Sequence, residues 1–170
     1  YNSLLELVVD NKLENYVKFH GMIPEHEVYK ILKRSNFSII PSFNEGFGVA
    51  TIESMASGTI TLGSNIAINN EIIQDKELLF SPFDHKQLTK LIIKFYSNKN
   101  LYTTKVDYLI NRVQKYTAKN TAKNHFSFPL ITSIIQGPTI SLMSVLNELK
   151  PPFDQLSFIN VKISLLSIIE

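Results

Sequence analysis

The 170-residue chain has no cysteine, little net charge and no long uninterrupted hydrophobic stretch. The absence of cysteine excludes disulfides and thiolate-bound metals, and it is typical of a reducing compartment. A formal net charge of +2 is too small to favour nucleic acid as a partner. No stretch reaches the roughly 18 apolar residues of a membrane span, and these residues contain no secretory-signal pattern. The hydrophobic content of 44% is enough for the core of one ordinary domain.

One short segment places two carboxylates, Glu45 and Glu53, eight positions apart on either side of a glycine-containing turn. Residues 37–40 before it read as a buried strand that ends at Pro41, because proline cannot donate to a strand ladder. The residues after Gly48 have helical spacing. A strand–loop–helix order presents backbone N–H groups at a helix N-terminus, which favours anions, while carboxylates accept hydrogen bonds from hydroxyls. A ligand with both phosphates and hydroxyls is a nucleotide sugar.

Helix-like and strand-like patterns alternate along the first 127 residues. We expect helices over 3–15, 25–35, 49–57, 84–97, 100–115 and 117–126, and strands over 16–19, 37–40, 60–63 and 78–80. Asn11 or Asn15 would end the first helix, Gly58 follows the third at a position typical of a helix end, and Asp84 caps the fourth. After Ser64 and Asn65, a turn is expected to lead into residues 70–73.

The helix over 49–57 has two predicted faces. Its apolar face is expected at Val49, Ile52 and Ala56, and a neighbouring, more polar face holds Ala50, Glu53, Ser54 and Ser57.

Strands separated by helices of about ten residues predict an α/β fold with a parallel sheet flanked by helices on both faces. Ligands of such sheets bind beyond the carboxyl ends of the strands. Three predicted strand ends carry polar residues or glycine, namely His20 and Gly21, residues 42–48, and Ser64 and Asn65. We therefore expect these segments to converge on one site.

The composition changes after residue 127. Residues 129–170 hold one Asp, two Glu and two Lys, with prolines at positions 129, 138, 151 and 152. We place a boundary near 127–129, which separates a domain over 1–127 from an extension over 128–170. One interpretation is the start of a βαβ-like module with strands at 130–135 and 158–163 around a helix at 139–149. The other, which we favour because the apolar surface has no evident partner, is an unstable extension.

Together these motifs resemble those of the group 1 glycosyltransferases. The residues that carry the resemblance are VKFHG (17–21), PSFNEGFG (41–48) and ESMASG (53–58), followed in the family's order by SN (64–65), NEII (70–73) and FSPFD (80–84). The match covers about residues 1–126. The resemblance implies a retaining enzyme of GT-B architecture, in which two Rossmann-like domains face each other across a cleft. This chain would be most of the C-terminal, donor-binding domain.

The resemblance also implies roles for individual residues. Glu45 would be the catalytic-site carboxylate facing the donor sugar; the implied donor-binding residues are Gly46, Phe47, Gly48, Val49, Glu53, His20, Gly21, Met22 and Asn65. The helix N-terminus after Gly48 would hold the diphosphate, Glu53 would accept hydrogen bonds from the ribose hydroxyls, and the loop 20–23 would border the base. The donor substrate would be a nucleotide-diphosphate sugar. No cofactor and no metal are expected, because no His, Asp and Glu residues have metal-ligand spacing.

Some parts of the family pattern are absent from these residues. The basic donor-phosphate residues and the N-terminal acceptor domain would lie upstream of Tyr1, and residues 66–70 lack the glycines and proline common there. We therefore interpret the chain as a fragment that binds its donor weakly and does not turn over. The expected location is the cytoplasm, with peripheral association at the inner face of the membrane left open for the full-length enzyme. Polysaccharide assembly is the expected process.

Other interpretations stay open. Glu45 could be a solvated loop charge, Glu53 a first-turn carboxylate favoured by the helix dipole, the two glycines of the loop only parts of a tight turn, and His20 structural. A different class of function is a non-catalytic remnant of the fold that only contacts a partner. A third is another GT-B enzyme, such as an epimerase or a phosphorylase, against which the spacing of the two glutamates argues.

Overall fold

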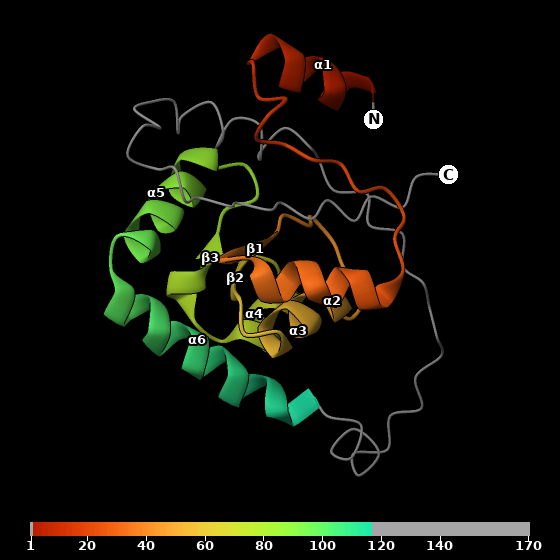
Figure 1. Cartoon of the computed structure of the whole chain (residues 1–170). Helices are drawn as coiled ribbons and strands as arrows, with labels where there is room; N and C mark the ends of the chain where they lie inside the picture. Colours follow the sequence, from red (N-terminus) through yellow and green to blue (C-terminus); the bar gives the residue numbers. More distant parts are fainter. Residues whose placement is uncertain (1, 117–170) are drawn as a thin grey trace.

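Three parallel strands surrounded by helices make up residues 2–116, the part of the chain that the computed structural model describes (Figure 1). The helices are α1 (Asn2–Asp10), α2 (Glu25–Arg34), α3 (Val49–Ala56), α4 (Ala67–Ile73), α5 (His85–Tyr96) and α6 (Lys99–Val113). The strands are β1 (Phe37–Ile40), β2 (Ile60–Ser64) and β3 (Leu79–Phe80), with short 3-10 helices η1 (Lys76–Leu78) and η2 (Gln114–Tyr116). The boundary expected near 127–129 and the elements expected over 117–126, 130–135, 139–149 and 158–163 lie outside the described residues.

The sheet has the order β1-β2-β3, and both of its pairings are parallel. Phe37 lies opposite Ile60 in the first pairing, and Ser64 lies opposite Phe80 in the second. All five residues of β2 are buried, so both faces of this central strand are covered. This confirms the predicted α/β fold with a parallel sheet flanked by helices.

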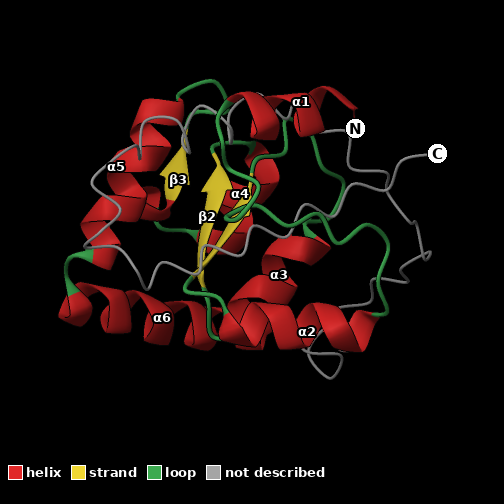
Figure 2. Ribbon diagram, turned by 45° about the horizontal axis from the view of Figure 1, so that its top comes forward, coloured by secondary structure: helices red, strands yellow, loops and turns green. Residues whose placement is uncertain are grey.

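The core forms where the helices close over the sheet. Its fully buried large side chains are Phe37, Phe80, Phe95, Met55, Ile60, Leu62, Ile72, Ile73, Leu78, Leu88, Ile92 and Leu109. They come from every described strand and from α3, α4, η1, α5 and α6. The arrows of β2 and β3 point toward the end of the molecule where α1 lies, and α6 crosses the opposite end (Figure 2). The carboxyl edge of the sheet therefore faces the α1 end.

Local capping explains several helix boundaries. The Asp84 side chain accepts a hydrogen bond from the Gln87 backbone N–H at 2.9 Å and begins α5, as expected. Asn98 does the same for the N–H of Leu101 at the start of α6. Gly58 follows α3 with a φ of 78°, the left-handed conformation common after a helix end. The predictions for Asp84 and Gly58 are confirmed because a cap involves residues within one turn of each other.

The strand expected over residues 16–19 is wrong. These residues form a turn and an extended connection, while β1, β2 and β3 pair only with one another in the described sheet. Val17 and Phe19 instead pack against a small apolar cluster of Leu4, Val8 and Leu13 around α1. A strand requires a neighbour to accept its hydrogen bonds, and no described strand borders this segment.

The end of the first helix agrees with one of the two expected positions, and the segment after β2 does not. The helix ends at Asp10, so Asn11 rather than Asn15 follows its last residue, and the Asn11 side chain donates to the Leu7 carbonyl at 2.8 Å. Instead of a turn that leads into residues 70–73, the chain forms α4 from Ala67, and this helix buries Ile72 and Ile73 against the core. Its seven residues are too few to show a clear helical period in the sequence.

The predicted apolar face of α3 is correct only for Ile52, which packs against the core. The helix buries Thr51, Ser54 and Met55, whereas Val49 is 50% exposed and Ala56 is exposed. Buried hydroxyls are tolerated when they are hydrogen-bonded, and here they are (see below). Hydrophobic spacing alone could not reveal those partners.

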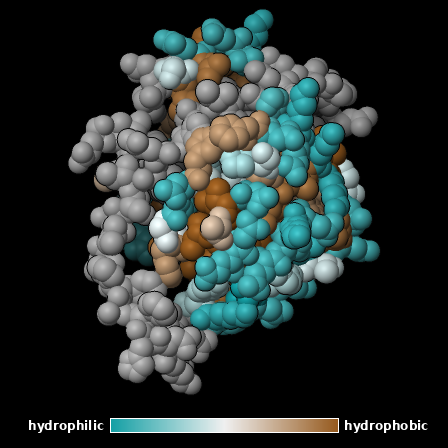
Figure 3. Space-filling view, turned by 180° about the vertical axis from the view of Figure 1, so that it is seen from behind, coloured by the Kyte–Doolittle hydropathy of each residue, from teal (hydrophilic) through white to brown (hydrophobic). Residues whose placement is uncertain are grey.

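The surface of the described part is mixed in character. Seen from behind, hydrophobic side chains gather between hydrophilic ones (Figure 3). None of the helices within residues 2–116 has the length and hydrophobicity needed to cross a bilayer.

Candidate functional site

Two contacts tie the strand ends together at the carboxyl edge of the sheet. The Ser64 hydroxyl, at the end of β2, donates a hydrogen bond to the backbone carbonyl of Ser42, just after β1. The backbone N–H of Asn65 donates to the carbonyl of Phe80, the last residue of β3, at 2.7 Å. The segments that follow the three described strands therefore start from a connected edge.

The loop from β1 to α3 ends at Gly48, and only glycine can occupy this position without strain. Its φ is 73°, and a Cβ atom added there would lie 2.3 Å from Ile72 Cδ1 and 3.3 Å from Ile68 Cγ1 on α4. Gly48 thus meets two structural requirements, the left-handed backbone of the turn and the close packing between α3 and α4.

The N-terminus of α3 is suited to an anion. No side chain among the described residues caps the helix, and its first turn contains no acidic residue. The first N–H groups of a helix have no intrahelical partner and carry a partial positive charge. In an α/β fold, such a terminus at the carboxyl edge is where phosphates bind.

Glu45 lies in the same loop and is half-buried. Its Oε2 atom and the Ser42 hydroxyl are buried without a hydrogen-bond partner among the described residues. Burial raises the pKa of Glu45, and the nearby Ser42 hydroxyl offsets part of that rise, although its position falls short of a hydrogen bond. A buried carboxylate oxygen without a hydrogen-bond partner costs free energy of folding. A hydrogen bond from a ligand or from another donor to Glu45 would offset that cost.

Glu53 lies in the second turn of α3 and is also half-buried. The hydroxyl of Tyr29, on α2, donates a hydrogen bond to Glu53 Oε1 at 3.3 Å. Burial raises the pKa of Glu53, the Tyr29 hydrogen bond opposes this, and the charge of Glu25 adds to the rise. The same surroundings raise the pKa of Tyr29 to about 12, chiefly through burial.

Buried polar pairs hold α3 in place beneath these two carboxylates. The hydroxyls of Ser38 on β1 and Ser54 on α3 lie 2.8 Å apart. Thr51 donates to the side-chain oxygen of Asn69 on α4 at 2.9 Å, and the Asn69 amide donates to the Ser64 carbonyl at 3.0 Å. Because each pair is buried and satisfied, the helix has one well-defined position against β1, β2 and α4.

The other residues of the expected donor site in this loop are accessible. Gly46 is exposed and has nothing within 4 Å of an added Cβ atom. Phe47 is 39% exposed and Val49 is 50% exposed. All three border the α3 N-terminus, where a ligand could reach the backbone.

His20, Gly21 and Met22 do not follow a strand, contrary to expectation. They lie in the connection between α1 and α2, where His20 is half-buried, Gly21 has a φ of 60° and Met22 is 86% exposed. The convergence expected from a strand end at residues 20–21 therefore loses its structural basis. Their role toward a base stays a prediction.

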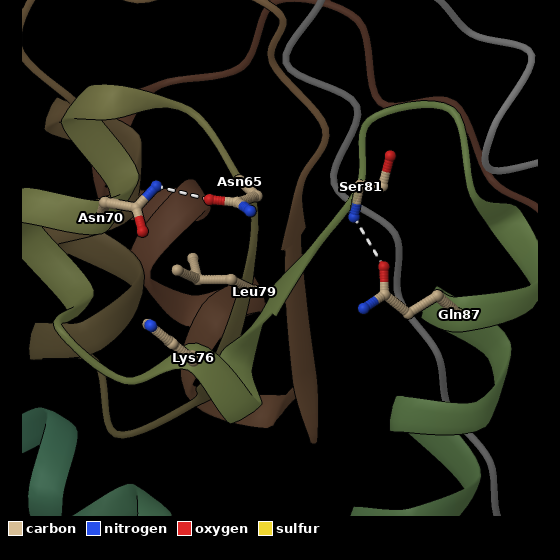
Figure 4. Close-up of a pocket in the computed structure, with 6 residues that line it drawn as sticks. All are labelled: Asn65, Asn70, Lys76, Leu79, Ser81 and Gln87. Carbon is tan, nitrogen blue, oxygen red and sulfur yellow. Dashed lines mark hydrogen bonds between the residues drawn. The ribbon is translucent and has the colours of Figure 1, made fainter.

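Asn65 is exposed directly after β2 and lines a cavity of about 390 Å³ beside the edge strand β3 (Figure 4). The other lining residues are Asn70, Lys76, Leu79, Ser81 and Gln87. Within it, Asn70 donates to the Asn65 side-chain oxygen at 2.6 Å, and the Ser81 N–H donates to Gln87 at 2.7 Å. These two bonds join four of the six lining residues to one another, so the cavity by itself specifies no ligand.

Three residues of the site were missed from the sequence: Tyr29, Ser42 as a buried hydroxyl, and Asn69. Tyr29 carries no local signal, because its partner Glu53 lies 24 positions away. Asn69 lies in the segment expected to be a turn, where an asparagine is ordinary.

Within residues 2–116, histidine, aspartate and glutamate side chains form no group of three or more that could hold a metal ion. The polar groups around the N-terminus of α3 include carboxylates, hydroxyls and backbone N–H groups. Such a set can accept hydrogen bonds from hydroxyls and donate them to an anion.

Comparison with known proteins gives a consistent result. A family model described as glycosyl transferases group 1 matches residues 2–116. The serotype-specific mannosyltransferase WbdA of Escherichia coli is 26% identical over 119 residues, which is 70% of this chain and 14% of that protein. The O-antigen chain mannosyltransferase RfbU of Salmonella typhimurium is 33% identical over 84 residues, 49% of this chain and 24% of that protein. The mannosylfructose-phosphate synthase of Agrobacterium fabrum is 31% identical over 103 residues, 59% of this chain and 23% of its own length.

The chain thus spans between 14% and 24% of the length of these three relatives. No solved structure matches it significantly.

Proposed function

The chain belongs to the group 1 glycosyl transferases, and we propose that it supplies the donor-binding part of a retaining enzyme of GT-B architecture. The enzyme transfers a sugar from a nucleotide-diphosphate donor to an acceptor hydroxyl. The acceptor is bound by a second domain that lies outside this chain, and the chain alone binds donor without turnover. The donor is a substrate, and no separate cofactor is required.

The observation that carries this proposal is the uncapped N-terminus of α3 beside the buried, unsatisfied Glu45 carboxylate. The helix N–H groups bind the diphosphate and stabilise the negative charge that develops on it as the sugar leaves. The loop 42–48 contains no basic residue, so further neutralisation comes from outside this loop.

The two carboxylates have separate roles. Glu45 precedes the glycine turn at the edge of the sheet and accepts a hydrogen bond from a hydroxyl of the donor sugar, which satisfies its Oε2 atom. Glu53, one turn into α3, accepts hydrogen bonds from the ribose hydroxyls. Holding both ends of the donor fixes the sugar in the orientation needed for transfer.

The names of the relatives suggest the first donor to test. Two of them are mannosyltransferases, one named for an O-antigen chain, so we propose transfer of a hexose, with mannose first, in polysaccharide assembly. We place this activity in the cytoplasm, with the full-length enzyme associated peripherally with the inner face of the membrane.

The proposal is tested by NMR titration of the 170-residue chain with UDP, GDP and ADP, and with their sugar conjugates. One of these nucleotides should give saturable shifts around α3. Glu53→Gln should weaken both the nucleotide and its sugar conjugate by about tenfold, or ~1.4 kcal/mol. Glu45→Gln should weaken only the conjugate, because Glu45 contacts only the sugar.

Glu71→Gln is the matched control, because Glu71 is an exposed glutamate near the C-terminal end of α4. This substitution should leave nucleotide binding unchanged. If a folded chain shows no saturable shift with any nucleotide, the donor site is refuted and the non-catalytic remnant is the better interpretation.

A further inference from the structure

Tyr29 contacts the candidate site from a different helix. It lies in the middle of α2, whose own buried residues are Val28 and Leu32, and it is half-buried beside α3. Its hydroxyl donates to Glu53 Oε1 at 3.3 Å, across 24 positions of sequence. This bond makes Tyr29 a fixed point for one oxygen of the carboxylate.

We propose that Tyr29 is a positioning residue that orients the Glu53 carboxylate toward the ribose hydroxyls of the donor nucleotide. The inference rests on the proposed function, because it concerns the same carboxylate. Tyr29 touches neither sugar nor phosphate, and acts only through Glu53.

The geometry supports this role in three ways. Tyr29 occupies Oε1 and leaves Oε2 to accept from a ligand, since a carboxylate has acceptor sites on both oxygens. Within residues 2–116 Glu53 forms no ion pair, and the Tyr29 hydroxyl is the hydrogen-bond donor to its carboxylate. The 3.3 Å distance is long for an O–H···O bond, and such bonds in catalytic sites often tighten only when substrate binds.

The charges around the pair favour a role in binding over a role in stability. Glu53 faces two ionisable groups, Tyr29 and the Glu25 carboxylate one turn earlier on α2, and the latter repels it. Burial and a neighbouring like charge both disfavour the ionised form of a carboxylate, so this arrangement costs free energy of folding. Structural ion pairs place a cation there instead, as Lys30 does for Glu27 at 2.6 Å on the same helix.

The test combines side-chain and ligand deletions. Glu53→Gln, Tyr29→Phe and the double variant are titrated with whichever of UDP, GDP and ADP binds tightest, and with its 2′,3′-dideoxy counterpart. Tyr29→Phe should weaken the ribonucleotide by about three- to tenfold and leave the dideoxy nucleotide unchanged. In the double variant, its effect should disappear, because Tyr29 acts only through Glu53.

Tyr102→Phe is the matched control, since Tyr102 also donates a hydrogen bond, to the Asn36 carbonyl before β1, away from the carboxyl edge. A second readout is the titration of the Glu53 carboxyl followed by carbon NMR without ligand. Loss of the Tyr29 hydrogen bond should raise the pKa of Glu53 further, while Tyr102→Phe should not change it.

The outcomes separate the two proposals. If Glu53→Gln weakens binding of the ribonucleotide more than binding of the dideoxy nucleotide, but Tyr29→Phe does not, the positioning role is wrong and the proposed function stands. Equal weakening of both ligands by Tyr29→Phe, or an unchanged Glu53 titration, also overturns the positioning role. If Glu53→Gln does not discriminate, or if no nucleotide binds, the ribose contact fails and the role of Tyr29 fails with it.

Discussion

Gly48→Ala should be strongly destabilising, because two separate costs meet at this position. An alanine at a φ of 73° is in the left-handed region, which costs roughly 1–2 kcal/mol. Its Cβ atom would also lie 2.3 Å from Ile72 Cδ1, and forcing a methyl group into a packed core costs about 1–3 kcal/mol. Ile72 is 1% exposed and has little room to move. We expect a loss of about 2–5 kcal/mol out of a total stability of ~5–15 kcal/mol.

Two other glycines separate these costs. Gly21 has a φ of 60° with nothing within 4 Å of an added Cβ atom, so Gly21→Ala measures the backbone cost alone. Gly46 has open space and no left-handed φ, so Gly46→Ala should change the free energy of unfolding by no more than about 1 kcal/mol. Urea unfolding of the three variants gives the comparison, and the clash equals the difference between Gly48→Ala and Gly21→Ala.

Ile72→Val isolates the clash directly, because it removes the Cδ1 atom. Alone it should cost about 0.5–1.5 kcal/mol. In the Gly48→Ala background it should cost less, or should restore stability. If Gly48→Ala loses no more than Gly21→Ala, and Ile72→Val costs the same in both backgrounds, the inferred contact between α3 and α4 does not constrain this position.

Two further predictions concern α6. Arg112→Met should lower the free energy of unfolding, measured in urea, by about 2–4 kcal/mol, because the buried guanidinium donates to the carbonyls of Ile72 at 2.9 Å and Glu71 at 2.7 Å. A loss below about 1 kcal/mol would contradict this. Lys105→Met removes a contact to Asp75 at 2.5 Å and a contact to Glu77 at 2.7 Å, and the second of these, with others, lowers the pKa of Glu77 from 4.5 to about 2. A lowered pKa stabilises the fold above pH 4.5, and this stabilisation is lost as the pH falls toward 2. The variant should therefore be less stable near neutral pH by about 1 kcal/mol after solvent screening, and its free energy of unfolding should depend less on pH between these values. Parallel stability curves of the variant and the unsubstituted protein against pH would refute the assignment.

Predictions from the sequence were most accurate where a structure depends on neighbouring residues. The strand at 37–40 and the helix that begins after Gly48 are observed at the expected positions. The start of α5 at Asp84 follows from a hydrogen bond between residues three positions apart. Proline, glycine and capping side chains act on the backbone within one turn, so they can be interpreted without knowledge of the fold.

The same predictions failed where the outcome depends on a distant partner. Residues 16–19 alternate as a strand would, but a strand exists only when another strand pairs with it. Ser54 was assigned to the more polar face of its helix, yet it is buried and shares a hydrogen bond with Ser38 on β1. Neither partner could be identified from periodicity.

The candidate site also combines features that local sequence predicts with features that depend on distant partners. The order of Glu45, Gly48 and Glu53 along the chain already indicated a helix N-terminus with carboxylates beside it, because strand, loop and helix follow from local chemistry. Folding added the buried orphan oxygen of Glu45 and the Tyr29 hydroxyl on Glu53. Burial and contacts between residues far apart in sequence arise only when helices pack on a sheet, and for that reason they decide how each carboxylate is held.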